Sequence, residues 1–358
     1  LHLSIRRQRQ MCIRDRSWLY IAYGHVSLIA GLFYGIKPAI TAVVVHAVHR
    51  IGSRALKNSW MWAIAAASFV AIFALNVPFP VIVLTAAVIG YLGGRYIPEK
   101  FTVGGGHGSA KKSYGPALID DNTPPPEHAR FRWSGLSKIV VVGAVLWVVP
   151  MAFLTLQFGW NHTLTQMGWF FTKAALLTFG GAYAVLPYIY QGAIGHYNWL
   201  TPTQMIDGLA LGEANPGPLI MVVAFVGFVG AYVQSVFGAD LQFVAGVTAA
   251  VLVTWFTFLP SFIFILAGGP LVESTHGNLK FTAPLTGITA AVVGVILNLA
   301  VFFAYHVLWP QGLKGSFDWI AAVMTVIAAI ALVRYKRNVI QVIGMSALVG
   351  LLLKTALP

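Results

Sequence analysis

One short cluster of small and polar residues interrupts an otherwise apolar stretch at Phe171–Pro187 (FTKAALLTFGGAYAVLP). Gly180 and Gly181 weaken a helix in mid-span, and irregular backbone in an apolar setting is tolerated only where protein or a polar cavity satisfies it. Freed amides, a helix N-terminus and the hydroxyl of Thr178 can then hold an anion, and Lys173 adds positive charge two turns before Gly180. A kinked helix that uses glycine for close packing explains the same pattern equally well.

A second cluster, Gly212–Pro218 (GEANPGP), has the residues of a helix start. Its prolines suit a first helical turn, and Asn215 has the side chain of an N-cap. We include Asn215 and Gly217 among the candidate substrate-binding residues because the positive end of a helix attracts anions. Glu213 is the first candidate for a proton-coupling group and Asp207 the second, since desolvation raises the pKa of a carboxyl group. An ordinary capped helix beside a solvated Glu213 is the alternative.

A third candidate is Lys37, which precedes a proline near one end of an apolar segment. This lysine either extends its ammonium group to the end of the segment or faces the cavity as a counter-charge for the substrate. His46 and His49 are one turn apart and have no third ligand nearby, so neither a metal site nor a cofactor is predicted.

These clusters lie in a chain with the composition of a membrane protein: 58% of its 358 residues are apolar and 9% are charged. Many stretches are long enough to cross ~30 Å of hydrocarbon as helices, so we predict an all-α polytopic membrane protein of about ten transmembrane helices. After a short segment at Ser17–Ala30, the predicted spans are Gly31–His49, Ser59–Leu75, Pro78–Gly94, Leu136–Gln157, Met167–Gln191, Pro216–Phe237, Leu241–Ala267, Pro284–Leu308, Phe317–Val333 and Val339–Lys354.

Alternate threading of these spans sorts the basic residues onto one side of the membrane. Lys138 and the loops on that side carry fourteen Lys and Arg, whereas the other side carries only Lys314 and Lys354. The positive-inside rule makes the basic side cytoplasmic, predicts a multi-pass protein of the cell inner (plasma) membrane, and explains the net charge of +13 without a nucleic-acid partner. The basic loops are 50–58, 95–135, 192–215, 268–283 and 334–338.

Two segments recur in the same order along the chain. GIKPAITAVVVH (35–46) resembles GITAAVVGVILN (287–298), and the segment that starts at Trp62 resembles the one that starts at Trp319. Chance similarity between apolar helices is the alternative. Seven spans separate the equivalent segments, an odd number, so we predict two inverted repeats, a device that recurs in secondary transporters.

These residues resemble the chromate ion transporter family from Ser17 to about Leu353. The similarity rests mainly on the pair of F-G-G and P-G-P motifs, which together are quite specific. The resemblance implies a membrane transporter that exports chromate, driven by the membrane potential or by a proton gradient. The matching segments are TFGGAYAVLPYI (178–189), Trp199-Leu200, PGP (216–218) with FVGFVGA (225–231), ITAAVVGVILNLA (288–300), GLFYGIKPA (31–39) and VPFPVIVL (77–84).

In the two-half members of that family, each half begins with an F-G-G helix and then a P-G-P helix. In this chain both motifs of the first half would precede Ser17, so we expect the N-terminal part of the first repeat to be missing. The expected organisation is a non-native or disordered tail at 1–16, the rest of the first repeat at 17–94, a cytoplasmic linker at 95–135, and the second repeat at 136–357.

The predicted function is therefore transport of a small oxyanion, with chromate as the first substrate and the lipid bilayer as the surroundings. Another inorganic anion such as sulfate, a membrane-embedded enzyme and a scaffold are the alternatives. An enzyme is not expected, because Asp120-Asp121 in the linker is the only adjacent carboxylate pair. The oligomeric state is open, and a homodimer is one candidate.

Overall fold

The computed structural model describes residues 13, 15–24, 26–101, 132–178, 181–214, 218–274 and 282–356. The described residues are helical and contain no strand, which confirms the all-α prediction. The helices are α2 (Ser27–Ala55), α3 (Ser59–Phe73), α4 (Phe79–Tyr96), α5 (Pro98–Phe101), α6 (Trp133–Phe158), α7 (Thr163–Leu176), α8 (Ala182–Tyr190), α9 (Pro202–Glu213), α10 (Val222–Val233), α11 (Gln242–Ser274), α12 (Thr282–Leu308), α13 (Trp319–Val333) and α14 (Val339–Ala356).

Six of these helical segments are long and apolar enough to cross a membrane. Three shorter apolar helices, α3, α10 with the 3-10 turn before it, and α13, add to them. α6 exposes large apolar side chains such as Val141, Phe153 and Leu156. Because a water-soluble surface would not expose such a helix, this face suits contact with lipid and supports a polytopic membrane protein.

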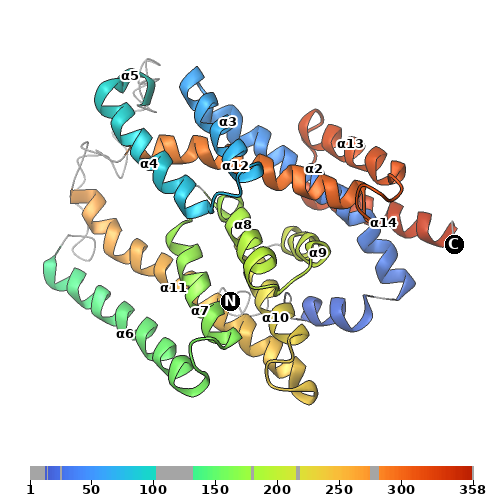
Figure 1. Ribbon diagram of the computed structural model, residues 1–358, viewed down its shortest axis with the longest axis horizontal. Coiled ribbons are helices and arrows are strands. Elements are labelled where there is room, and N and C mark those ends of the chain that lie inside the picture. The colour runs from blue at the N-terminus through green and yellow to red at the C-terminus, as the bar shows by residue number, and fades with distance from the viewer. Residues whose placement is uncertain are drawn as a thin grey trace, which may run out of the picture.

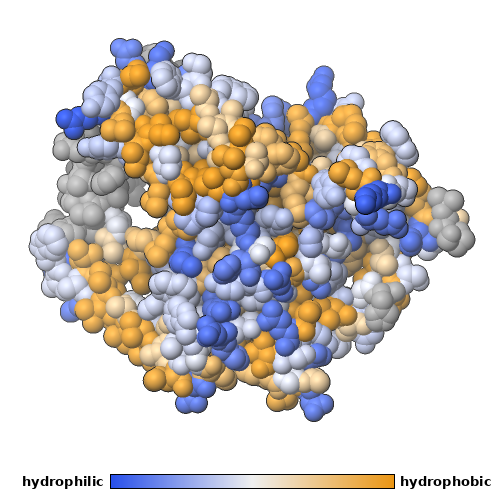
Figure 2. All heavy atoms as spheres, viewed as in Figure 1, coloured by the Kyte–Doolittle hydropathy of each residue, from blue (hydrophilic) through white to orange (hydrophobic). Residues whose placement is uncertain are grey.

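The helices form two bundles, and α8 and α9 lie between them (Figure 1). In the first bundle α2 packs against α12, α13 and α14, and α12 packs against α3 and α4. In the second bundle α11 packs against α6, α7 and α10. α8 contacts α12, while α9 contacts α2 and α10. Figure 2 shows hydrophilic side chains gathered in the centre of this face, over α8 and α9, between two apolar regions.

The first bundle is built from two equivalent units whose hairpins are exchanged. α2 precedes the hairpin α3–α4 but packs on α13–α14, and α12 precedes α13–α14 but packs on α3–α4. Asn58 caps α3 and Asp318 caps α13, each by accepting from the third amide. Asn76 (φ 51°) and Lys336 (φ 50°) turn the two hairpins at equivalent places. This packing is what a pair of repeats predicts.

Glycines fix the register of that packing. A Cβ on Gly35 would overlap Ser346 and Gly350 of α14, and a Cβ on Gly287 would overlap Ala86 and Gly90 of α4. Gly35 and Gly287 are therefore equivalent, as the sequence comparison predicted.

The second sequence match is displaced. The structural counterpart of Asn58 is Asp318, 260 residues later, so Trp62 does not correspond to Trp319. Two tryptophans near the start of apolar helices produced the shifted alignment. The opposite orientation of the two units in a membrane stays a prediction.

Three predicted boundaries are wrong. α2 continues to Ala55 and includes residues predicted as the loop 50–58. The predicted loop 192–215 contains a π-helix, Gln191–His196, and α9. The predicted span Met167–Gln191 is divided between α7 and α8, at the glycines that the sequence had marked as a weak point.

Candidate functional site

The candidate site is built around the break between α7 and α8. α7 ends at Leu176, and α8 begins at Ala182 after Gly181, whose φ of 113° suits glycine and strains other residues. A Cβ on Gly181 would meet no atom within 4 Å, so open space adjoins the start of α8. Gly180, a predicted site residue, lies outside the described residues.

A cavity of about 280 Å³ lies at this break, and we call it the helix-break cavity. Ala182 at the start of α8 and Leu219 at the start of the 3-10 turn Leu219–Met221 both line it. The N-cap residues Gly181 and Pro218 make no side-chain cap, so within the described part of the chain the first-turn amides have no such partner. Two positive helix ends therefore converge on one cavity. The other described lining residues are Ala175, Thr178, Pro218, Ile220, Thr257, Phe258 and Ser261.

Of the predicted anion ligands Thr178 and Lys173, only Thr178 lines this cavity. Thr178 lines the cavity, but its hydroxyl donates to the carbonyl of Ala174 at 2.7 Å. It must rotate away from that carbonyl before it can donate to an anion. Lys173 does not line the cavity; it is half-buried one turn earlier, with its Nζ 5.6 Å from the ring centroid of Trp169. Lys173 is therefore not a contact residue of this cavity.

α9 carries both predicted coupling residues to the centre of the molecule. Thr201 and Gln204 form a reciprocal capping box around Pro202, so the sequence did contain a helix-start signal in the predicted loop. At the other end of α9, Glu213 accepts a hydrogen bond from the hydroxyl of Tyr183 on α8. Burial raises the pKa of Glu213, and the bond from Tyr183 opposes that shift. Asn215 and Gly217 lie outside the described residues.

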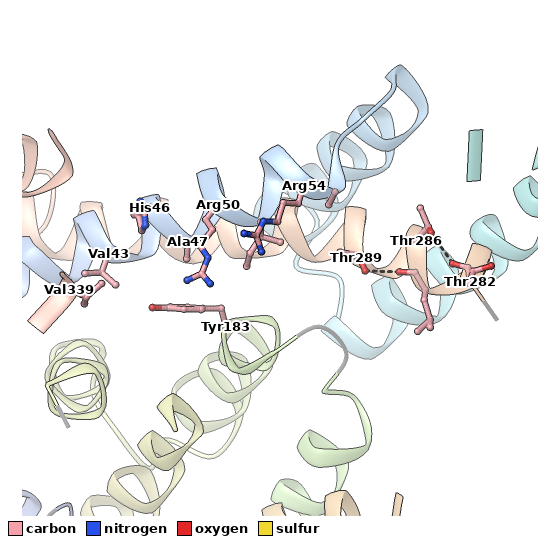
Figure 3. Close-up of a pocket in the computed structure, with 13 residues that line it drawn as sticks. Val43, His46, Ala47, Arg50, Arg54, Tyr183, Thr282, Thr286, Thr289 and Val339 are labelled. Carbon is pink, nitrogen blue, oxygen red and sulfur yellow. Dashed lines mark hydrogen bonds between the residues drawn. The ribbon is translucent and has the colours of Figure 1, made fainter. Parts of the chain in front are cut away.

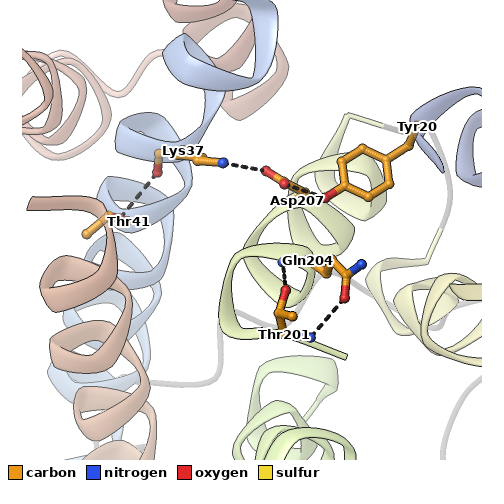
Figure 4. Close-up of polar contacts among 6 residues, drawn as sticks. All are labelled: Tyr20, Lys37, Thr41, Thr201, Gln204 and Asp207. Atoms are coloured by element: carbon orange, nitrogen blue, oxygen red, sulfur yellow. Dashed lines mark hydrogen bonds and ion pairs between the residues drawn. The ribbon is translucent and has the colours of Figure 1, made fainter. Parts of the chain in front are cut away.

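Lys37 is paired with Asp207 and lines neither cavity (Figure 4). Its Nζ lies 3.6 Å from Asp207 Oδ1, and the hydroxyl of Tyr20 donates to Oδ2 at 2.8 Å. α9 is not one of the candidate spans, yet Asp207 is only 2% exposed. Burial raises the pKa of Asp207 to about 6, although Lys37 and Tyr20 both act to lower it. The sequence named both residues but could not show that they meet.

A larger cavity of about 640 Å³ lies between α2, α8 and α12, and we call it the arginine cavity (Figure 3). His46, Arg50 and Arg54 follow one another at four-residue spacing along α2 and line it together with Tyr183. Sequence reasoning placed both arginines in a loop and missed this site. The four-residue spacing was the available signal, because it puts all three side chains on one face if the helix continues.

The arrangement has the features of a transport protein rather than of a metal centre. Among the described residues no group of three or more His, Cys, Asp or Glu could hold a metal ion. Instead, a helix broken inside an apolar bundle meets a second helix start and a cavity beside it. Discontinuous helices of this kind form substrate sites in secondary transporters, so the fold and site define a polytopic α-helical membrane protein of the transporter class.

The chain belongs to the chromate transporter family, whose sequence profile matches residues 13–91 and 165–351. It is 31% identical over 285 residues to the chromate transport protein of Pseudomonas aeruginosa, an alignment that covers 78% of this chain and 57% of that protein. It is 23% identical over 337 residues to the chromate transport protein of Cupriavidus metallidurans, covering 93% and 69%.

The probable chromate transport protein of Synechococcus elongatus is 22% identical over 286 residues, covering 79% of this chain and 60% of that relative. The chain thus spans less than two thirds of the length of the Pseudomonas and Synechococcus relatives. No solved structure matches the chain.

Proposed function

We propose that the protein exports chromate, or a similar small tetrahedral oxyanion, across the cell inner membrane, and that the helix-break cavity binds the anion. The observation that carries this proposal is the convergence of two helix N-termini, both without a side-chain cap among the described residues, on one cavity of about 280 Å³. At roughly 30 Å³ per water molecule, that volume accommodates a small hydrated oxyanion. The similarity to two chromate transport proteins supports chromate as the first substrate.

The chemistry of the site suits an anion that must be released again. Backbone amides donate without carrying a full charge, and helix ends supply partial positive charge. Lys173 adds one full charge nearby without contact, which limits the strength of binding. In this proposal Thr178, Gly180, Gly181, Asn215 and Gly217 form the immediate site, Lys173 contributes from a distance, and Lys37 contributes when it is released from Asp207.

The energy source follows from the charge of the substrate. Moving each negative charge out of a cell that is negative inside is favoured by about 2.3 kcal/mol per 100 mV, and a dianion gains roughly twice that. Voltage alone is therefore sufficient to drive export. A proton gradient is the second driving force that we consider, with Glu213 and Asp207 as the carriers of the proton.

Gly181→Leu tests the site in inside-out membrane vesicles under an imposed voltage. The added side chain fills the open space beside α8, so we expect chromate flux to be abolished while the protein still inserts. Gly181 directly precedes Ala182, which lines the cavity. Gly238→Leu is the matched control, because Gly238 has similar backbone angles (φ 90°, ψ 167°) and open space but adjoins no lining residue. Equal loss of flux in both variants would show that backbone strain, rather than cavity filling, is responsible.

The same vesicles test the substrate. We expect sulfate, a tetrahedral dianion, to compete with chromate, and chloride to compete poorly. Absence of chromate flux in the wild-type protein under voltage, with insertion confirmed, would refute the proposed function.

A further inference from the structure

The arginine cavity has the chemistry of a second anion site, separate from the helix-break cavity. Arg50 and Arg54 line it from the last two turns of α2, and neither has an ion-pair partner within the described part of the chain. None of its described lining residues is acidic. Guanidinium groups bind tetrahedral oxyanions in bidentate fashion, so two unpaired arginines on one wall favour a multiply charged oxyanion over a halide.

A histidine on the same helix adds a polar side chain to the lining of the arginine cavity. His46 Nδ1 is buried and has no hydrogen-bond partner among the described residues. His46 lines the cavity one turn before Arg50, as Figure 3 shows. Because Nδ1 is buried from solvent, the imidazole can meet a ligand in this cavity only through its other atoms.

The arginine cavity and the helix-break cavity share a wall at the first turn of α8. Ala182 lines the helix-break cavity, and the next residue, Tyr183, lines the arginine cavity. The hydroxyl of Tyr183 donates to Glu213, which ends α9. This hydrogen bond therefore joins α8, which contributes to the lining of both cavities, to the end of α9.

We propose that the arginine cavity is a capture site that binds a tetrahedral oxyanion dianion from the cytoplasm and delivers it past Tyr183 to the helix-break cavity. This inference rests on the proposed function, because it assigns the capture step to the same transport path. The positive-inside rule places Arg50 and Arg54 on the cytoplasmic side, from which an exporter takes its substrate. The phosphate of an anionic lipid shares the chemistry of a free oxyanion, so the test must separate these two sources.

The first arm measures binding of radiolabelled chromate to the purified full chain by equilibrium dialysis in a phosphate-free detergent. Arg50→Gln with Arg54→Gln removes two charge-assisted donors, and we expect the affinity of one binding phase to fall at least about tenfold. Arg95→Gln with Arg337→Gln is the matched control, since it removes the same charge from the same predicted side and neither residue lines the cavity. An equal loss in both double variants would overturn the inference, because it would reflect general electrostatics.

A lipid arm uses phosphatidylglycerol in the same dialysis. Chromate that stays bound to the wild-type protein in the presence of this lipid supports a free-oxyanion site. Displacement of the Arg50- and Arg54-dependent phase by phosphatidylglycerol would overturn the inference in favour of a lipid site.

The transport arm separates this inference from the proposed function. In inside-out vesicles the double arginine variant should raise the chromate concentration for half-maximal flux about tenfold and leave the maximal rate nearly unchanged. Gly181→Leu should instead abolish the maximal rate. Normal flux with unchanged half-saturation in the arginine variant would refute the capture site and leave the proposed function intact. Arginine-dependent binding without any wild-type flux would refute the proposed function and the delivery step, and would leave only an oxyanion-binding site at the two arginines.

Discussion

Asp207 is the carboxylate whose surroundings best fit a change of protonation. It is nearly fully buried, it faces the ammonium group of Lys37, and it accepts from Tyr20. With a pKa raised to about 6 by burial, Asp207 is mainly charged at pH 7.5 and about half protonated at pH 6. Protonation removes the counter-charge of Lys37. As the pH falls, Asp207 therefore binds a proton and Lys37 loses its ion-pair partner at the same time.

Asp207→Asn tests this coupling in vesicles with the voltage clamped to zero and only a pH gradient imposed. We expect the pH-driven chromate flux to disappear and the voltage-driven flux to remain, because Asn cannot carry the proton. Asp240→Asn, an exposed acid on another turn, is the control and should change neither flux. Combining Asp207→Asn with Lys37→Gln removes the unpaired charge and restores insertion if the single variant inserts poorly.

Glu213→Gln distinguishes the two candidate carboxylates in the same assay. Loss of pH-driven flux in Glu213→Gln but not in Asp207→Asn would assign the proton to the Tyr183–Glu213 pair. A pH gradient that drives no flux in the wild-type protein would exclude both and leave voltage as the driving force.

At the scale of elements, the sequence predicted features that depend on one continuous segment and missed features that depend on contacts between distant segments. The spans around α3, α4, α6 and α13 followed from continuous apolar runs, and the break before α8 followed from Gly180-Gly181. α9 was missed because its apolar residues alternate with polar ones over only 12 residues, although its capping box was visible. The closure of the arginine cavity by α8 and α12 and the Lys37–Asp207 pair could not be predicted, because each joins helices that are far apart along the chain.

The close approach of α2 to α14 at Gly35 can be tested by substitution. Gly35→Ala places a methyl group against the backbone of Ser346 on α14, and we expect the temperature of unfolding in detergent to fall by several degrees. Gly344→Ala on α14 is the control, because its Cβ would meet no atom within 4 Å. Alanine favours a helix by about 1 kcal/mol over glycine, so this control should be neutral or slightly stabilising. Equal effects of the two substitutions would contradict the observed packing of α2 on α14.

At the scale of the whole molecule, the orientation in the membrane rests on the distribution of basic residues. We expect Ser113 and Asn338 to face the cytoplasm and Thr163 to face the periplasm. An impermeant thiol reagent applied to intact cells should label Thr163→Cys but neither Ser113→Cys nor Asn338→Cys, in a background with Cys12→Ser. Labelling of either cytoplasmic position from outside would reverse the orientation and move the arginine cavity away from the source of the substrate.

The exchange of hairpins in the first bundle also constrains how the protein is made and how it arose. The ribosome completes α2, α3 and α4 long before the partners of α2, the helices α13 and α14, exist. The faces of α2, α3 and α4 that pack on later helices therefore stay uncovered in the bilayer until those helices are inserted. The first bundle then forms in one late step. Two identical shorter chains could make the same contacts by domain swapping, in which each chain packs its hairpin on the other chain. Fusion of such a swapped pair into one gene would convert an association that depends on concentration into an intramolecular one.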